Sequence, residues 1–222
     1  MRPDLVSVIL PAFNAEPYLR AAVASVLAQR HDPIEIIVVD DGSTDGTGAL
    51  AEGFGPPARA ISQSHAGPGA ARNRGVEAAR GAWLTFLDAD DLWPTAKIAR
   101  QLAALAEEPE ETAVFGRVQQ FRERDGMAID IGASSSGHHV GAMMIGRRAF
   151  DRVGLFRTDL RVGEFVDWHL RASAAGIRMK TLPEVMLLRR IHGENLGVRM
   201  RAHSGDFVRV LKDALDRRRG KT

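Results

Sequence analysis

Cysteine is absent from the 222-residue sequence, and tyrosine occurs only once. Without cysteine the chain forms no disulfide, no thiolate nucleophile and no Cys-ligated zinc site, and its composition fits a reducing compartment. The first residues carry no signal-peptide core, and no apolar run approaches the roughly 20 residues of a membrane-spanning helix. We therefore expect a cytoplasmic protein without a transmembrane segment, with a peripheral position at the inner face of the membrane as a further possibility.

A large excess of either charge is also missing. The 30 Lys and Arg residues nearly balance the 28 Asp and Glu residues, which gives a formal net charge of +2. This balance argues against non-specific binding to nucleic acid. The apolar content of 45% is ordinary for a globular protein, and the chain is long enough to bury a core. Because we find no repeats and no low-complexity linker, we expect one domain over residues 1–222.

Strand-like and helix-like patterns alternate through the first half of the chain. Continuous apolar and β-branched runs are typical of parallel strands that are covered on both faces, and apolar residues at helical spacing lie between them. This succession predicts an α/β fold with a mostly parallel, Rossmann-like central sheet and helices on both faces. The predicted strands are 5–10, 34–39, 58–62 and 83–87, and the predicted helices are about 18–29, 44–54, 70–80 and 95–107.

The second half is less regular. We predict strands at 113–121, 141–145 and 185–191, helices at 148–153, 165–175 and 207–219, and a mobile Gly/Ser loop at 129–139. We divide the chain into a nucleotide-sugar half (about 1–110), a smaller and irregular acceptor half (about 111–204) and a C-terminal helix with a basic tail (205–222). The arginines at 217–219 fit a solvated tail, with contact to anionic lipid or a partner as the alternative. A homodimer also remains open.

Three carboxylates, Asp88, Asp90 and Asp91, follow the predicted strand at 83–87. Like charges this close repel each other, so they usually need a cation or shared protons. Hard oxygen ligands on a turn suit Mn²⁺ or Mg²⁺, especially where phosphates complete the coordination. A polar turn that caps the next helix is the simpler alternative.

Other predicted strands end in polar loops as well. In a parallel sheet the carboxyl ends of the strands form one edge, where ligands bind. We therefore expect Asn14, Asp41 and Asp90 to lie on the same edge.

A set of short motifs runs through residues 4–196. It comprises Val6-Ser-Val-Ile-Leu-Pro-Ala-Phe-Asn14, Val38-Val-Asp-Asp-Gly-Ser-Thr-Asp45, Gly67-Pro-Gly-Ala-Ala-Arg-Asn-Arg74, Phe86-Leu-Asp-Ala-Asp-Asp91, Gly154-Leu-Phe156, the stretch 163–171 and Arg190-Ile-His-Gly-Glu-Asn195. In this order and spacing the motifs resemble a family-2 glycosyltransferase of the GT-A fold. Each motif is weak alone, but the combination is highly specific.

The resemblance implies an inverting, metal-dependent enzyme that moves a sugar from a nucleotide-sugar, most often a UDP-sugar, to an acceptor hydroxyl. The acceptor would be a glycan, a lipid-linked glycan or another hydroxyl compound, and the metal Mn²⁺ or Mg²⁺. By the same resemblance Asp90 would bind the metal, and His192 would reach the metal or the diphosphate. The residues assigned to the donor site are Pro11, Phe13, Asn14, Asp41, Arg72 and Asp88.

The chain departs from the family pattern at the catalytic base. The family commonly has Glu-Asp where this sequence has Glu164-Phe165, and the missing Asp is the usual base. Glu164 and Asp167 remain, and residues three apart share a helix face, so both could point into the cleft. We favour Glu164, with Asp167 second. Trp168 either stacks on an acceptor ring or packs in the core. The departure also keeps open a non-catalytic nucleotide-sugar-binding protein.

Three motifs suggest other functions. Residues 41–52 meet the ligand spacing of a calcium-binding EF-hand, but a strand precedes them. Residues 67–69 lack the third glycine of a dinucleotide loop. An aspartate-nucleophile phosphatase shares the strand-Asp-x-Asp pattern. It would need a later lysine, for which Lys97 and Lys180 are the candidates.

Overall fold

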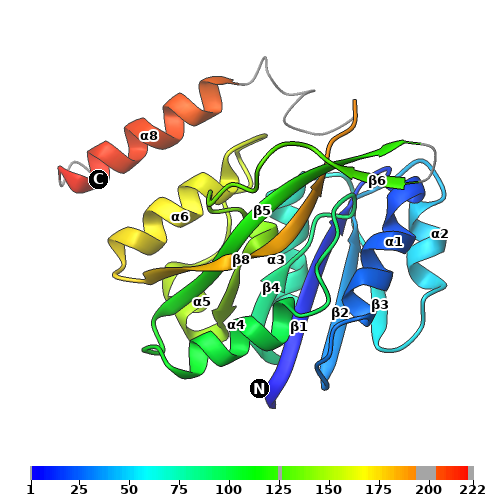
Figure 1. The fold of residues 1–222 in the computed structure, drawn as a ribbon. Coiled ribbons are helices and arrows are strands. Elements are labelled where there is room, and N and C mark those ends of the chain that lie inside the picture. Colours follow the sequence, from blue (N-terminus) through cyan, green and yellow to red (C-terminus); the bar gives the residue numbers. More distant parts are fainter. Residues whose placement is uncertain (1, 125–126, 194–203, 220–222) are drawn as a thin grey trace.

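An eight-stranded sheet forms the centre of the molecule, with helices packed around it (Figure 1). The computed structural model describes residues 2–124, 127–193 and 204–219. The strands are β1 (Arg2–Ala12), β2 (Ile34–Asp40), β3 (Ala58–Ser62), β4 (Gly81–Phe86), β5 (Thr112–Arg124), β6 (Met127–Asp130), β7 (Met144–Gly146) and β8 (Arg178–Arg190). The helices are α1 (Glu16–Leu27), α2 (Thr47–Glu52), α3 (Pro68–Ala78), α4 (Lys97–Ala106), the 3-10 turn η1 (Val140–Ala142), α5 (Arg147–Val153), α6 (Glu164–Ala174) and α8 (Ser204–Arg218).

The strand order confirms the predicted, mostly parallel α/β sheet. It runs β3-β2-β1-β4-β7-β5-β6, and β8 pairs with β5. The strands β1 to β4 pair in parallel, as do β5 and β8, whereas β7 lies antiparallel between β4 and β5. Both halves of the chain contribute strands to the same sheet.

Each face of the sheet carries its own apolar layer. Val8 and Leu10 of β1 pack with side chains of α1 and α4, whereas Ile9 packs with α3, α5 and α6. Alternate residues of a strand point to opposite faces, so a strand covered on both faces is apolar throughout. Each fully buried side chain of this size stabilises the fold by about 1.5–3 kcal/mol. The helices therefore lie on both faces, as predicted.

The strand predicted at 185–191 begins earlier, as β8 at Arg178, and two further predictions for the second half are wrong. The predicted loop at 129–139 begins inside β6, and Arg117 ties its later part to β5 by donating from Nε to Ser134 Oγ over 2.7 Å. The strand predicted at 141–145 is instead η1 followed by the short strand β7. Both differences arise from contacts between segments far apart in sequence, which local composition does not encode.

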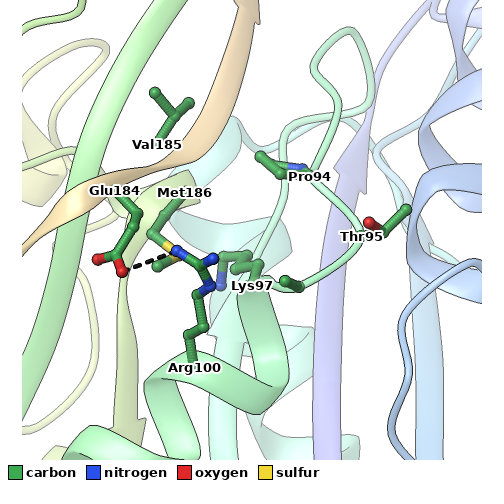
Figure 2. Close-up of a pocket in the computed structure, with 8 residues that line it drawn as sticks. Pro94, Thr95, Lys97, Arg100, Glu184, Val185 and Met186 are labelled. Atoms are coloured by element: carbon green, nitrogen blue, oxygen red, sulfur yellow. Dashed lines mark ion pairs between the residues drawn. The ribbon is translucent and has the colours of Figure 1, made fainter.

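Lys97 is buried in the apolar layer at the start of α4. Its ammonium group donates to Thr85 Oγ1 and Gln101 Oε1, each over 2.7 Å, and lies 4.0 Å from the centre of the Trp93 ring. Burial lowers the pKa of Lys97 well below its usual value. Lys97 lines a pocket of about 230 Å³. Arg100 and Glu184 line it as well and form an ion pair of 2.7 Å (Figure 2).

We expect Lys97→Met to change how stability depends on pH. In the unfolded chain this lysine keeps its proton up to pH ~10.4, whereas the folded chain releases it at lower pH. The unfolded state therefore binds more protons between the two pKa values, and wild-type stability rises with pH by up to about 1.4 kcal/mol per unit. The variant lacks this slope. Urea unfolding at pH 7, 8 and 9 measures the difference.

The matched control is Lys180→Met, which removes a lysine whose side chain is 32% exposed and pairs with Glu108. A stability difference between wild type and Lys97→Met that stays constant over this pH range would show that Lys97 keeps its proton in the folded state.

Candidate active site at the carboxyl edge of the sheet

The loops after β1 and β2 are joined by hydrogen bonds. Asn14 Oδ1 accepts from the backbone N of Thr44 over 2.8 Å, and the backbone N of Asn14 donates to Ser43 Oγ over 3.0 Å. Asn14 has a positive φ of 48°, a conformation that asparagine tolerates better than most residues. Asn14 thus joins the two loops at the edge where it was predicted to lie.

Asp41 organises the loop that leads to α3. One carboxylate oxygen accepts from Gln63 Nε2 and from the backbone N of Ala66, over 2.7 and 2.9 Å. The other accepts from the backbone N of Gly67 over 2.8 Å and lies 2.9 Å from His65 Nδ1. Asp41 is only 3% exposed, so these bonds offset the cost of burying its charge.

The same loop carries an exposed pair of rings. Phe13 is 40% exposed and stacks on His65, with ring centres 4.1 Å apart. Pro11, the second-last residue of β1, pairs with Val39 of β2. A flat, exposed ring stack beside polar loops is a surface on which a nucleobase can stack.

Arg72 links two candidate carboxylates. Its Nη1 donates to Glu164 Oε1 over 2.5 Å, and its Nη2 donates to Asp88 Oδ1 over 2.7 Å. The buried guanidinium therefore holds α6 and the turn after β4 on one side chain. Burial raises the pKa of Asp88, but the Arg72 charge outweighs burial and holds this pKa below its usual value.

Close packing of α3 makes this link possible. A Cβ atom added to Gly69 would lie 2.5 Å from the carbonyl oxygen of Arg157 and 3.6 Å from Cβ of Glu164. Glycine therefore lets α3 approach the segment before α6. Glu164 is the first residue of α6 and follows Gly163, whose φ is 85°. The second oxygen of Glu164 makes no hydrogen bond within the described ranges, so it is available to a ligand.

His192 lies next to Asp90 at the end of β8. Its Nε2 is 3.0 Å from Asp90 Oδ2, and its ring stacks on Tyr18 with centres 4.6 Å apart. The neighbouring Arg190 donates from Nε to the backbone oxygen of Asp90 over 2.8 Å. The structure thus brings together the two residues assigned to the metal. The rest of their motif, Glu194 and Asn195, lies outside the described residues.

A second group of metal-ligand side chains lies at the same turn. Oxygen atoms of Asp88 and Asp91 and a ring nitrogen of His139 all lie within 4.8 Å of one another. Burial raises the pKa of Asp91 well above its usual value, and Asp90 and Asp88 raise it further. A divalent cation would relieve this repulsion. The carboxylates of the turn therefore fit Mn²⁺ or Mg²⁺.

His139 fits a hydrogen-bond donor better than a metal ligand. Its Nδ1 accepts from the backbone N of Gly141 over 3.1 Å. An amide N–H can only donate, so neutral His139 carries its proton on Nε2. In the sequence His139 ends the loop predicted at 129–139, where we expect a surface histidine, with a role as metal ligand or acceptor-site group as the alternative. Its position directly before the apolar stretch 140–145 could have indicated that it lies near the acidic turn, because that stretch returns to the sheet beside β4.

Asp167 and Trp168 lie apart from the site. Asp167 is fully buried and accepts from Arg171 Nε over 2.7 Å, with Arg217 at 3.3 Å and Arg157 at 3.9 Å. The expectation that both candidate bases face the same cleft is not met. Trp168 is fully buried in the layer of α5 and α6, where its Nε1 donates to the Gly154 carbonyl. It has no exposed ring face, so the alternative of core packing is correct.

The calcium-binding and phosphatase alternatives do not fit the structure. Residues 41–52 follow a strand rather than a helix, and Asp45 Oδ1 accepts from the backbone N of Thr47 over 3.0 Å, which contradicts an EF-hand. The phosphatase alternative needs a lysine near Asp88. Lys180 instead pairs with Glu108 at 3.0 Å, and Lys97 is held inside the core by Thr85 and Gln101.

The strand order and the helices on both faces define the fold class, which is the GT-A fold. A family model described as glycosyl transferase family 2 matches residues 7–166. The chain therefore belongs to glycosyl transferase family 2. Because the match covers most of the chain, it confirms the resemblance on which the sequence motifs were assigned.

Individual relatives agree with this family. The putative glycosyltransferase EpsH of Bacillus subtilis is 30% identical over 181 residues, which cover 77% of this chain and 52% of EpsH. The structure of Staphylococcus aureus TarS 1–349 with UDP has a TM-score of 0.69 at 20% identity, covering 94% of this chain and 66% of TarS. The mannosyltransferase PcManGT of Pyrobaculum calidifontis with GDP-Man and Mn²⁺ has a TM-score of 0.73 at 22% identity, covering 97% of this chain and 65% of that one.

The chain spans only part of the curated relatives that it matches, between 18% and 52% of their length for GlyA of Streptococcus pneumoniae and EpsH. Among the helices of the described ranges, none is both long and apolar enough to cross a bilayer.

Proposed function

We propose that this chain transfers a sugar from a UDP-sugar to an acceptor hydroxyl, with inversion at the anomeric carbon and with Mn²⁺ or Mg²⁺ bound. The observation that carries the proposal is the Arg72 bridge. One guanidinium holds both Asp88, on the donor side, and Glu164, the candidate base. A transferase needs a donor-binding group and a base on opposite sides of the reacting carbon. Arg72 holds Asp88 and Glu164 close enough to each other for these two roles.

The donor occupies the edge formed by β1, β2 and β4 in this proposal. The nucleobase of the donor stacks near the Phe13 and His65 rings, and Asp41 holds the loop beside these rings. Asp88, Asp90 and His192 hold the divalent ion, which when bound stabilises the negative charge of the departing nucleoside diphosphate. TarS and PcManGT, whose structures contain UDP or GDP-Man with Mn²⁺, support this class of donor and ion.

Glu164 takes the acceptor proton in a single displacement. The hydroxyl hydrogen passes to the free oxygen of Glu164 while the hydroxyl oxygen forms a bond to the anomeric carbon. The bond from that carbon to the diphosphate oxygen breaks, and its electron pair leaves with the diphosphate. Attack opposite to the leaving group inverts the configuration. In this proposal residues 1–110 supply the donor site except for His192, and the half at about 111–204 supplies that histidine, the catalytic base and the acceptor side.

Calorimetric titration with UDP, with and without Mn²⁺, tests the donor and metal assignments. We expect Mn²⁺-dependent UDP binding in the wild type and a loss of about 10²-fold in affinity in Asp90→Ala, because the ion then lacks a direct ligand. The control is Asp151→Asn, which neutralises a carboxylate that is 54% exposed and pairs with Arg147.

Two results would contradict the proposal. Equal UDP affinity in wild type and Asp90→Ala would show that Asp90 is not a ligand of the metal ion. A wild type that binds neither UDP, GDP nor dTDP with any divalent metal would leave the transferase function without support. Saturated UDP-sugar binding without any turnover or hydrolysis would instead indicate a non-catalytic binding protein.

A further inference from the structure

The C-terminal helix α8 is fixed to the body by its inner face. Val210 is fully buried, and Asp206 accepts from the backbone N of Arg161 over 2.9 Å. Asp213 accepts from Arg157 over 2.6 Å, and Arg217 donates to Asp167 over 3.3 Å. Figure 1 shows α8 lying along the outer side of α6. These contacts set which side of α8 faces away from the protein.

The outer side of α8 carries an apolar stripe. Phe207, Val208, Leu211 and Leu215 are 43%, 68%, 55% and 51% exposed. The spacing of 207, 211 and 215 places three of them along one side of the helix, and 208 widens this row. The four make up half of the eight exposed large apolar side chains in the part of the chain that the structure describes. Single exposed apolar residues are ordinary, but a contiguous group marks an interaction surface.

Charges on α8 are sorted around this stripe. At about 100° per residue, Lys212 and Arg219, the residue directly after α8 whose backbone N still donates to the Leu215 carbonyl, both lie at the border beyond Val208, and both are exposed. Two of the acidic residues, Asp206 and Asp213, instead face the protein, where they accept the hydrogen bonds described above. The surface that faces away is therefore apolar in the middle and carries Lys212 and Arg219 along one border, with the half-buried Asp216 beyond them.

The stripe begins beside the candidate base. A Cβ atom added to Gly163 would lie 3.3 Å from the ring of Phe207, and Gly163 directly precedes Glu164. Whatever covers the outer side of α8 therefore lies close to the end of α6 from which Glu164 projects. This position connects the surface to the acceptor side of the site.

We propose that the apolar stripe of α8 inserts into the surface of an anionic lipid bilayer, where Lys212 and Arg219 contact headgroup phosphates. A helix with an apolar side and a basic border is suited to the interface plane of such a membrane. A second copy of the chain fits less well. Four side chains offer on the order of a few hundred Å², below the roughly 800 Å² per partner of a stable interface.

The proposal also names an acceptor class, and in this respect it rests on the proposed transferase function. Docking through α8 holds the Glu164 end of α6 at the lipid surface. The hydroxyl that reaches Glu164 then belongs to an acceptor carried by a membrane lipid.

Vesicle co-sedimentation tests the surface. We expect wild-type protein to bind vesicles of phosphatidylglycerol and phosphatidylethanolamine, and to bind phosphatidylcholine vesicles at least about tenfold more weakly because of the missing charge. Val208→Ser/Leu211→Gln should lower binding to the anionic vesicles by at least about tenfold, since it removes apolar contacts. Lys212→Gln should lower it by about fivefold. The matched control is Leu27→Gln on α1, a leucine that is 50% exposed.

Three outcomes would overturn the proposal: no preference for anionic vesicles in wild type, unchanged binding in the double variant, or a wild-type dimer that the double variant dissociates. UDP titration of the same proteins separates the two proposals. Lost vesicle binding with intact UDP binding confirms the role of the stripe. Absent UDP binding with intact vesicle binding would contradict the transferase function alone.

Discussion

Glu164→Gln is expected to lower kcat by about 10²- to 10⁴-fold, the range over which a general base contributes. The amide keeps the size of the side chain, and its oxygen can still accept from Arg72. It cannot take a proton from the acceptor hydroxyl. Because Asp88 still holds Arg72, UDP affinity should stay unchanged. Turnover of UDP-sugar together with UDP titration measures both quantities.

The control for this variant is Glu184→Gln, which changes a glutamate that is 41% exposed and pairs with Arg100. Two outcomes separate a base from a positioning residue. If Glu164→Gln retains wild-type kcat, the proton goes elsewhere. If it loses UDP affinity as strongly as kcat, Glu164 acts mainly by holding Arg72 in place.

The sequence was sufficient to place the donor-side residues on one edge of the sheet. The strands that end before Asn14, Asp41 and Asp88 are buried on both faces, and such strands appear as continuous apolar runs. Parallel pairing of β1, β2 and β4 then brings their ends together. Local composition and one topological rule determine this part of the site.

The side-chain pairings could not be predicted in this way. The Arg72 bridge joins residues 92 and 16 positions apart, and it depends on the close approach of α3 that Gly69 allows. The spacing of Glu164 and Asp167 correctly suggests neighbouring helix positions. It contains no information about α8, whose Arg217 reaches Asp167 from 50 positions further along the chain.

In the second half of the chain, contacts between distant residues were equally impossible to predict from the sequence. The segment 131–139 has a Gly/Ser composition typical of a loop, yet backbone hydrogen bonds of 2.8 and 2.9 Å join Ser135 to Val118 of β5. Its fixed position brings His139 to the acidic turn. A residue type that is common in loops thus gives no indication of the partner that holds it.

Asp167→Asn is expected to reduce stability rather than catalysis. The side chain is fully buried, and it provides the negative charge for Arg171, Arg217 and Arg157. Removing one partner of a buried ion pair costs about 3–5 kcal/mol. These arginines are 21%, 32% and 25% exposed, so water compensates part of the loss. We therefore expect about 3 kcal/mol, at the lower end of this range.

A loss of this size corresponds to a decrease in Tm of roughly 6–12 °C for a protein of this length. Urea unfolding and thermal melting measure it, and Asp151→Asn, which breaks an exposed pair, should cost less than about 0.5 kcal/mol. Because Asp167 has no contact with the acidic turn, kcat at a temperature where the variant is folded should stay near the wild-type value. A strong loss of kcat without a loss of stability would instead identify Asp167 as the base. In that case the three arginines would have to release its carboxylate when the acceptor binds.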